Sequence, residues 1–135
     1  MTSGTRAVLD ANVYVRAAVD KKESARAWTE TLGLAVSAHA PDLLWPEFTN
    51  SLRGLVASAA ISRRFAQQAI DLTKRLPIQL HSTRDLAEKA LDAALAHQLS
   101  AYDACYLVLA DALEATLVTA DRRLADAARR AELLA

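Results

Sequence analysis

The sequence predicts an α/β protein: a three-layer α/β/α sandwich around a short-stranded, mainly parallel sheet, formed by one domain over residues 1–135. Thirty alanines against three glycines and three prolines favour helices, because alanine loses no side-chain entropy in a helix. Short apolar segments recur between the helical stretches and are followed by polar helix-start residues. Short strands that alternate with helices are typical of a parallel sheet covered on both faces.

Five short strands and seven helices are predicted along the chain. Brief apolar or β-branched runs predict strands at residues 7–9, 36–38, 78–81, 116–119 and 133–135. Helical patterns cover residues 12–19, 23–33, 46–60, 63–75, 84–99, 101–114 and 122–131.

Several helices carry signals for their ends or their surroundings. Pro46 stands in the first turn of the third helix, where its missing N–H does no harm, and Ser62 is placed to cap the fourth. In the fifth helix Leu91, Leu95 and Leu99 recur four residues apart, which predicts an amphipathic surface helix with an inward row of leucines. The helix over 101–114 is apolar almost all round, which predicts that the rest of the domain encloses it.

Charge and cysteine content restrict the partners and the compartment. Sixteen basic and sixteen acidic residues give zero net charge, so any contact with nucleic acid must be local. No stretch approaches the roughly 20 apolar residues that span a bilayer, so neither secretion nor membrane insertion is expected. Cys105 is the single cysteine and lies in an apolar run, which favours a buried thiol and a cytoplasmic protein.

Common catalytic motifs are absent from the sequence. The three glycines are too few and too scattered for a glycine-rich nucleotide loop. His39, His81 and His97 show no zinc-binding spacing and are interpreted as structural. There is no nucleophile elbow, and a cysteine in an apolar helix has a raised pKa and poor access.

Four acidic residues stand at the boundaries of predicted elements: Asp10, Glu47, Asp103 and Asp121. Taken singly, each has a structural explanation. Asp10 and Asp121 are placed to cap the helices that follow them, and Glu47 and Asp103 lie in first turns, where acids complement the helix dipole. Taken together, two follow strands and two begin helices that pack against the sheet, so all four are expected to meet at one edge of it.

Such a meeting of carboxylates predicts a metal site. Two carboxylates about 4 Å apart repel by about 4 kcal/mol at an effective dielectric constant of 20, so the cluster needs a cation or shared protons. Oxygen ligands without cysteine or histidine select Mg²⁺ or Mn²⁺. Because Mg²⁺ usually keeps waters that a substrate phosphate can displace, metal-assisted phosphodiester hydrolysis is the reaction class that these residues favour.

Four segments, AVLDANVYV, LLWPEFTNSL, SAYDACYLVLA and TLVTADRRLADAA, resemble the PIN-domain ribonucleases, and within them the VapC-type toxins of bacterial toxin-antitoxin pairs. They follow the family's order and approximate spacing over nearly the whole chain. The resemblance implies that the four acids form the metal site and that Asn12 and Thr119 support it through hydrogen bonds. Many relatives carry a further aspartate two or three residues after the last acid, where this chain has Arg123 and Leu124, so a second metal position is not supported.

The function that the resemblance implies is a Mg²⁺-dependent endoribonuclease, the toxin of a type II VapBC pair, which hydrolyses RNA with metal-activated water. A VapB-type antitoxin would cover the acidic groove and inhibit it, and a homodimer is expected. Holding RNA at an acidic site requires cations on its rim, although a run of charges on a helix is also typical of a solvated face. The candidate RNA-binding residues are Arg16, Arg122 and Arg123, followed by Arg129 and Arg130.

Three other functions remain compatible with these residues. A non-catalytic PIN-like module would use the acids as helix caps and bind a protein in its groove. A housekeeping PIN nuclease would cleave RNA without being a toxin. A phosphatase of the haloacid dehalogenase type, with Asp10 as nucleophile, fits less well, because Asn12 stands where a second aspartate is needed and no lysine follows Lys89.

Overall fold

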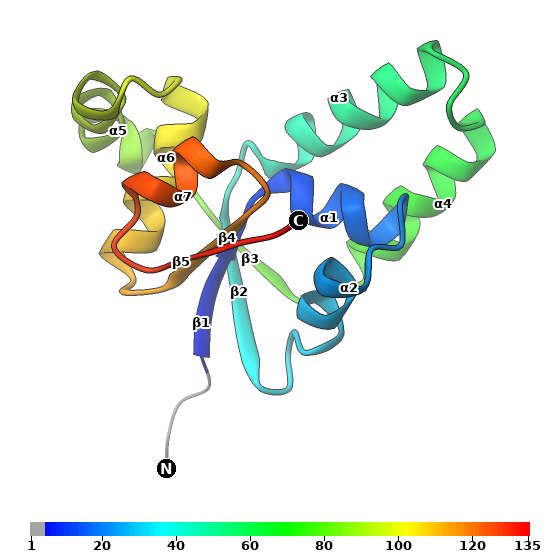
Figure 1. Cartoon of the computed structure of the whole chain (residues 1–135), viewed down its shortest axis with the longest axis horizontal. Coiled ribbons are helices and arrows are strands. Elements are labelled where there is room, and N and C mark those ends of the chain that lie inside the picture. Colours follow the sequence, from blue (N-terminus) through cyan, green and yellow to red (C-terminus); the bar gives the residue numbers. More distant parts are fainter. Residues whose placement is uncertain (1–4) are drawn as a thin grey trace.

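The computed structural model describes residues 5–135 and contains a five-stranded sheet at its centre (Figure 1). The strands are β1 (Thr5–Leu9), β2 (Val36–Pro41), β3 (Ile78–His81), β4 (Thr116–Thr119) and β5 (Ala131–Leu133). Their order in the sheet is β3-β2-β1-β4-β5, and every neighbouring pair is parallel. The predicted short-stranded parallel sheet is therefore confirmed.

Helices cover both faces of the sheet and complete the predicted three layers (Figure 1). They are α1 (Ala11–Ala18), α2 (Glu23–Glu30), α3 (Leu44–Ala57), α4 (Arg63–Lys74), α5 (Thr83–His97), α6 (Ala101–Ala112) and α7 (Arg122–Ala127). The first four helices lie on one side of the sheet, and α5, α6 and α7 lie on the other. No helix within residues 5–135 has the length and apolar character needed to cross a membrane.

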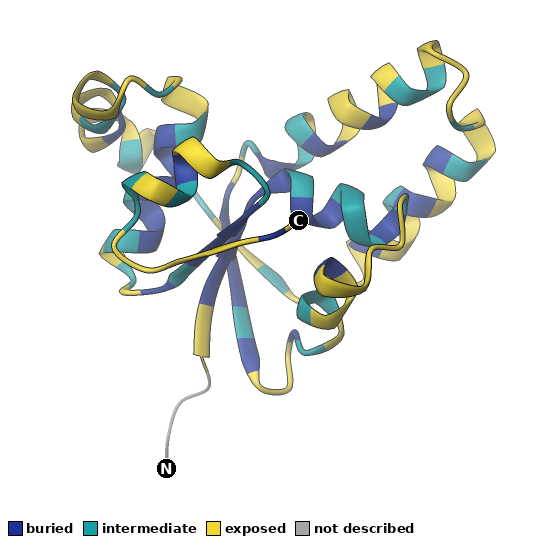
Figure 2. Ribbon diagram, in the orientation of Figure 1, coloured by how far each residue is buried: buried dark blue, intermediate teal, exposed yellow. Residues whose placement is uncertain are grey.

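Side chains that alternate along each strand form two separate cores, one on each face of the sheet. In β1, Leu9 packs into the core under α1 and α3, whereas Val8 packs into the core under α6. In β4, Val118 and Leu117 divide between the same two cores. This period of two is expected for a strand buried on both faces, and Figure 2 shows the buried residues concentrated along the sheet.

Helix α6 is enclosed, as the sequence predicts. Six of its residues are buried, Cys105 among them, and burial raises the pKa of that thiol. The Ser100 side chain accepts a hydrogen bond from the backbone N–H of Asp103 at 3.1 Å and so caps the helix. Because α6 packs on β1, β2 and β4, its first turn has a fixed position relative to the carboxyl ends of these strands.

The prediction of an inward row of leucines is wrong for Leu91 and Leu95 of α5, whereas Leu99, just after the helix, packs against the core under α6. Leu91 and Leu95 are 58% and 70% exposed, and the helix instead turns Ala90 toward Ala104 and Cys105 of α6. Small side chains at this contact allow the two helices to approach closely. The spacing of apolar residues along a helix identifies its apolar rows. It does not show which of these rows the neighbouring helix covers.

The end of the chain also differs from the prediction. Helix α7 ends at Ala127 instead of residue 131, and β5 begins at Ala131 instead of residue 133. Leu117 donates its backbone N–H to the carbonyl of Arg130, so pairing along β4 replaces the last helical turn. Arg129 and Arg130 consequently do not lie on the final helix.

Candidate active site

The site lies where the connections from two adjacent strands diverge. β1 and β4 are neighbours in the sheet, but the chain leaves β1 into α1 on one face and leaves β4 toward α7 on the other. Such a switch point opens a crevice at the carboxyl ends of parallel strands, where α/β proteins commonly bind ligands. Asp10 follows β1 directly, and Thr119 ends β4.

Asp10 stands at the N-cap position of α1, yet its side chain makes no capping hydrogen bond. Its backbone N–H donates to the carbonyl of Val118 at 2.9 Å and continues the pairing of β1 with β4. Its Oδ2 accepts a hydrogen bond from the Thr119 hydroxyl at 2.8 Å and one from the Asn12 amide at 3.1 Å. The capping interpretation of Asp10 is therefore wrong, because the carboxylate is directed across to β4.

Thr119 and Asn12 link the ends of β1 and β4. The Thr119 hydroxyl accepts a hydrogen bond from the backbone N–H of Asp121 at 3.0 Å, and Asn12 Oδ1 accepts one from the N–H of Ala120 at 3.2 Å. Asp121 in turn caps α7, since its Oδ1 accepts from the N–H of Arg123 at 2.9 Å. These contacts fix the turn after β4 against the Asp10 carboxylate.

The other two acids enter from helix starts. Glu47 is in the first turn of α3 and Asp103 in the first turn of α6, and both are half-buried. The positive end of each helix dipole favours a carboxylate at this position. Both acids therefore lie in first helical turns, as their sequence positions predict.

The acids lie within electrostatic reach of one another. Burial is the largest cause that raises the pKa of Asp10 from 3.8 to about 7, and the negative charges of Asp103 and Glu47 raise it further against the lowering effect of Thr119. Burial and Asp103 raise the pKa of Glu47. Burial and Asp121 raise the pKa of Asp103. Four segments that are distant in sequence thus place their carboxyl groups in one electrostatic cluster.

The chemistry of this cluster suits a hard divalent cation. Its side chains offer oxygen ligands only, and Glu47 Oε1 is buried without a hydrogen-bond partner. Within residues 5–135, however, no three aspartate, glutamate, histidine or cysteine side chains lie close enough together to hold an ion as they stand. Side-chain adjustment is therefore needed before these acids can share one.

The candidate RNA-binding arginines divide into two groups. Arg16 on α1 donates to the carbonyl of Ala135 at 3.1 Å, and Arg123 donates to the carbonyl of Gln98 and lowers the pKa of Asp103. Arg122, next to Arg123 in the sequence, is exposed. The three arginines lie on α1 and α7, the helices that begin directly after Asp10 and Asp121.

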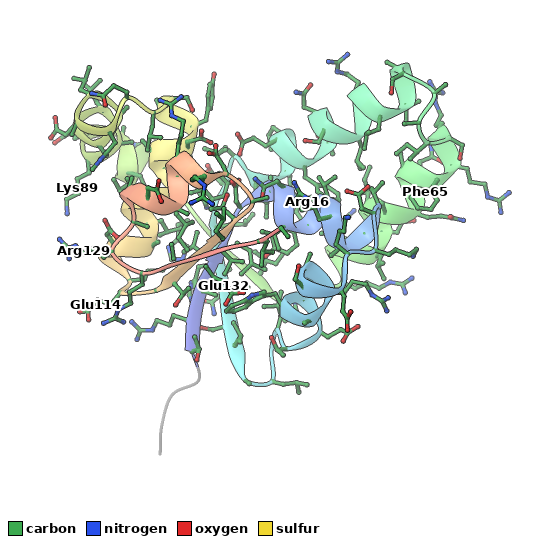
Figure 3. All side chains as sticks on the ribbon, in the orientation of Figure 1. Arg16, Phe65, Lys89, Glu114, Arg129 and Glu132 are labelled. Atoms are coloured by element: carbon green, nitrogen blue, oxygen red, sulfur yellow. The ribbon has the colours of Figure 1, made fainter. Side chains whose placement is uncertain are left out.

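Arg129 and Arg130 lie elsewhere. Arg130 donates to the carbonyl of Glu114 at 2.9 Å, and Arg129 lines a small hollow with Glu114. Figure 3 shows Arg129 and Glu114 at the outer edge of the molecule, across the sheet from Arg16. Because β5 pairs with β4 in this region, the two arginines face the amino end of β4 and are removed from the candidate RNA rim.

Two histidines meet although their sequence spacing does not indicate it. His39 Nδ1 and His81 Nε2 are 2.9 Å apart, joined by a hydrogen bond between β2 and β3, and Ser37 contacts the other nitrogen of His39 at 3.2 Å. Burial, His81 and Arg6 lower the pKa of His39. The contact therefore joins two neighbouring strands of the sheet.

Comparison with known proteins identifies the family of this chain. Residues 7–130 match the model of the PIN domain. The chain belongs to the PIN-domain family. The matched residues include the four acids, Asp10, Glu47, Asp103 and Asp121.

The relatives of this PIN domain include proteins named as VapC ribonucleases. It is 38% identical over 125 residues to "Ribonuclease VapC1" of Mycobacterium tuberculosis, and this alignment covers 89% of this chain and 89% of the relative. It is 35% identical over 88 residues to "Ribonuclease VapC9" of the same species, which covers 65% of this chain and 68% of the relative. Among solved structures, VapBC2 from Rickettsia felis bound to a promoter DNA fragment matches with a TM-score of 0.71 and 18% identity, over 97% of this chain and 100% of that chain, and supports the fold.

Proposed function

We propose that this PIN domain is a divalent-metal-dependent endoribonuclease and the toxin of a type II VapBC toxin-antitoxin pair. The observation that carries the proposal is the meeting of Asp10, Glu47, Asp103 and Asp121 in one electrostatic cluster at the switch point of the sheet. Its relatives named as VapC ribonucleases support RNA as the substrate. In this proposal all four acids are catalytic residues.

The chain's own side chains would divide the work as follows. Asp10, Asp103 and Asp121 would hold the cation, and Glu47 would orient it. A bound Mg²⁺ or Mn²⁺ supplies charge neutralisation and lowers the pKa of an attacking water. Asn12 and Thr119 hold the Asp10 carboxylate in one direction through the hydrogen bonds described above. In-line attack of water on the phosphorus would break its bond to the 3′ oxygen, which takes up a proton, and so would leave a 5′-phosphate and a 3′-hydroxyl.

Binding of RNA and of an inhibitor follows from the same charges. Arg16 on α1 and Arg122 and Arg123 on α7 would contact phosphates; of these, Arg123 lies near the acids and lowers the pKa of Asp103. A VapB-type antitoxin would cover the acidic groove, and a guanidinium from it would compete with the cation for the carboxylates. The active toxin is proposed to be a homodimer, which its molecular mass in solution tests directly.

Cleavage of RNA by the purified protein tests the proposed function. With Mg²⁺ or Mn²⁺ the protein is expected to cut structured RNA, and EDTA is expected to stop it. Asp103→Asn should reduce the rate by more than about 100-fold, because removing a ligand costs more than the 10–100-fold loss typical of a supporting residue. Asp111→Asn, on the same helix and outside the cluster, is the matched control.

Expression in cells separates the remaining alternatives. Growth arrest by the wild type, without arrest by Asp103→Asn, together with new 5′-phosphate ends on cellular RNA, supports a toxin. RNA cleavage without growth arrest indicates a housekeeping nuclease. Cleavage that persists in EDTA or in Asp103→Asn contradicts the metal-dependent proposal, and no cleavage at all indicates a protein-binding module.

Thr119 gives a second test of the site. Thr119→Val keeps the branched shape of a fully buried residue but removes the hydroxyl that donates to Asp10 and accepts from Asp121. We expect cleavage to fall by roughly 10–100-fold, because the carboxylate loses its direction. Thr116→Val, at the start of the same strand, is the control, and equal rates in the two variants would show that the Thr119 hydroxyl does not support the site.

A further inference from the structure

Two buried polar atoms beside the acidic cluster have no hydrogen-bond partner. They are the hydroxyl of Tyr106 and Oε1 of Glu47, and the hydroxyl of Tyr14 is the third such atom within residues 5–135. A buried polar group without a partner costs about 1–3 kcal/mol in general, so native proteins rarely leave one unpaired. Two such atoms on residues near the same acids therefore require an explanation.

Tyr106 and Glu47 are complementary in chemistry and in place. An ionised carboxylate only accepts hydrogen bonds, and a phenol, with an ordinary pKa near 10, donates one. The hydroxyl of Tyr106 is close enough to lower the pKa of Glu47, and the charges of Glu47 and Asp10 raise the pKa of Tyr106 beyond the effect of burial. Burial raises the pKa of Tyr14, and Tyr14 in turn adds to the raised pKa of Tyr106, after burial and the charges of the two acids.

The fold holds Tyr106 in this position. It is fully buried and packs among Val8, Leu109 and Leu117 beneath the sheet. It also stands three residues after Asp103 on α6, so both residues lie on one face of that helix. A single rigid helix thus presents a carboxylate at the edge of the site and a phenol below it.

We propose that Tyr106 is a positioning residue for Glu47: its hydroxyl donates to Oε1, directly or through one buried water, and thereby directs the other carboxylate oxygen toward Asp10 and Asp103. This inference rests on the proposed function of the acidic cluster. The bond ties α3 to α6 at the point where both helices deliver an acid. A water in this position would have the polar partners that buried waters require.

Tyr106→Phe tests the inference, because it removes the hydroxyl and keeps the ring that packs in the core. The control is Tyr102→Phe, on the same helix at a side chain that is 65% exposed. Titration calorimetry with Mn²⁺ is expected to show affinity reduced by roughly 10–100-fold in Tyr106→Phe and unchanged in the control. The melting temperature without metal is expected to fall by about 3–6 °C, since the Glu47 carboxylate loses its donor.

The same substitution in a Glu47→Ala background separates positioning from packing. In that background the Tyr106 hydroxyl has no carboxylate to which it can donate, so Tyr106→Phe is expected to leave the melting temperature unchanged or to raise it. An equal fall in both backgrounds would assign Tyr106 to packing alone and overturn the inference. Mn²⁺ affinity in Tyr106→Phe within twofold of the wild type would also overturn it, whereas failure of the wild type itself to bind Mn²⁺ would count against the proposed function.

Discussion

Asp10→Asn is expected to make the metal-free protein more stable at pH 8 while it abolishes RNA cleavage. Asp10 is only 7% exposed, and its pKa is raised from 3.8 to about 7, mainly by burial. A shift of this size corresponds to a penalty on the order of 4 kcal/mol for the charged form in the folded state. An asparagine avoids most of this penalty and keeps an acceptor for the Thr119 hydroxyl, so we expect a gain of about 2–4 kcal/mol.

The pH dependence of this gain has a definite sign. Because the folded state binds the Asp10 proton more tightly than the unfolded state, the wild type loses stability as the pH rises from about 4 to about 7. The difference between variant and wild type should therefore be larger at pH 8 than at pH 5. Urea denaturation in EDTA at both pH values measures it, with the exposed Asp92→Asn as control. Equal stabilities of Asp10→Asn and wild type at pH 8 would contradict the buried, strained state of this carboxylate.

The location of the acids was predictable because each depends on local sequence and on one general rule of parallel sheets. Asp10 and Asp121 follow apolar strands, and Glu47 and Asp103 begin helices, so the sequence indicates the edge at which they meet. The hydrogen bonds of Asp10 to Thr119 were expected only from the family resemblance. They depend on β1 pairing with β4, more than a hundred residues away along the chain.

Other features depend on contacts that local sequence does not encode. The alanine-rich end of the chain has a helical pattern, but pairing with β4 takes residues 131–133 into the sheet. The pairing of His39 with His81 requires the register of β2 against β3. In the sequence, Tyr106 is indistinguishable from the other core residues of an enclosed helix. The role proposed for its hydroxyl depends on the position of Glu47, which lies on a separate helix.

Binding of Mn²⁺ or Mg²⁺ is expected to stabilise the protein strongly at pH 8 and weakly at pH 5.5. A ligand that binds only the folded state at 100 times its Kd contributes about 2.7 kcal/mol. Asp10 must release its proton before it can share the cation, so the apparent affinity should fall roughly tenfold for each pH unit below about 7. Thermal melts at a fixed metal concentration across this range measure the effect.

The position of this pH window identifies the group that titrates. An exposed aspartate, with an ordinary pKa near 3.9, is already ionised at pH 5.5, so a site made of such groups would bind the cation equally well at both pH values. A loss of metal stabilisation centred near pH 7, absent in Asp10→Asn, would assign the effect to Asp10. Stabilisation that is independent of pH above 5 would show that the cation binds without this carboxylate. The charge that destabilises the metal-free fold is then also the charge that draws in the cation, since both effects arise from ionising one buried acid among three others.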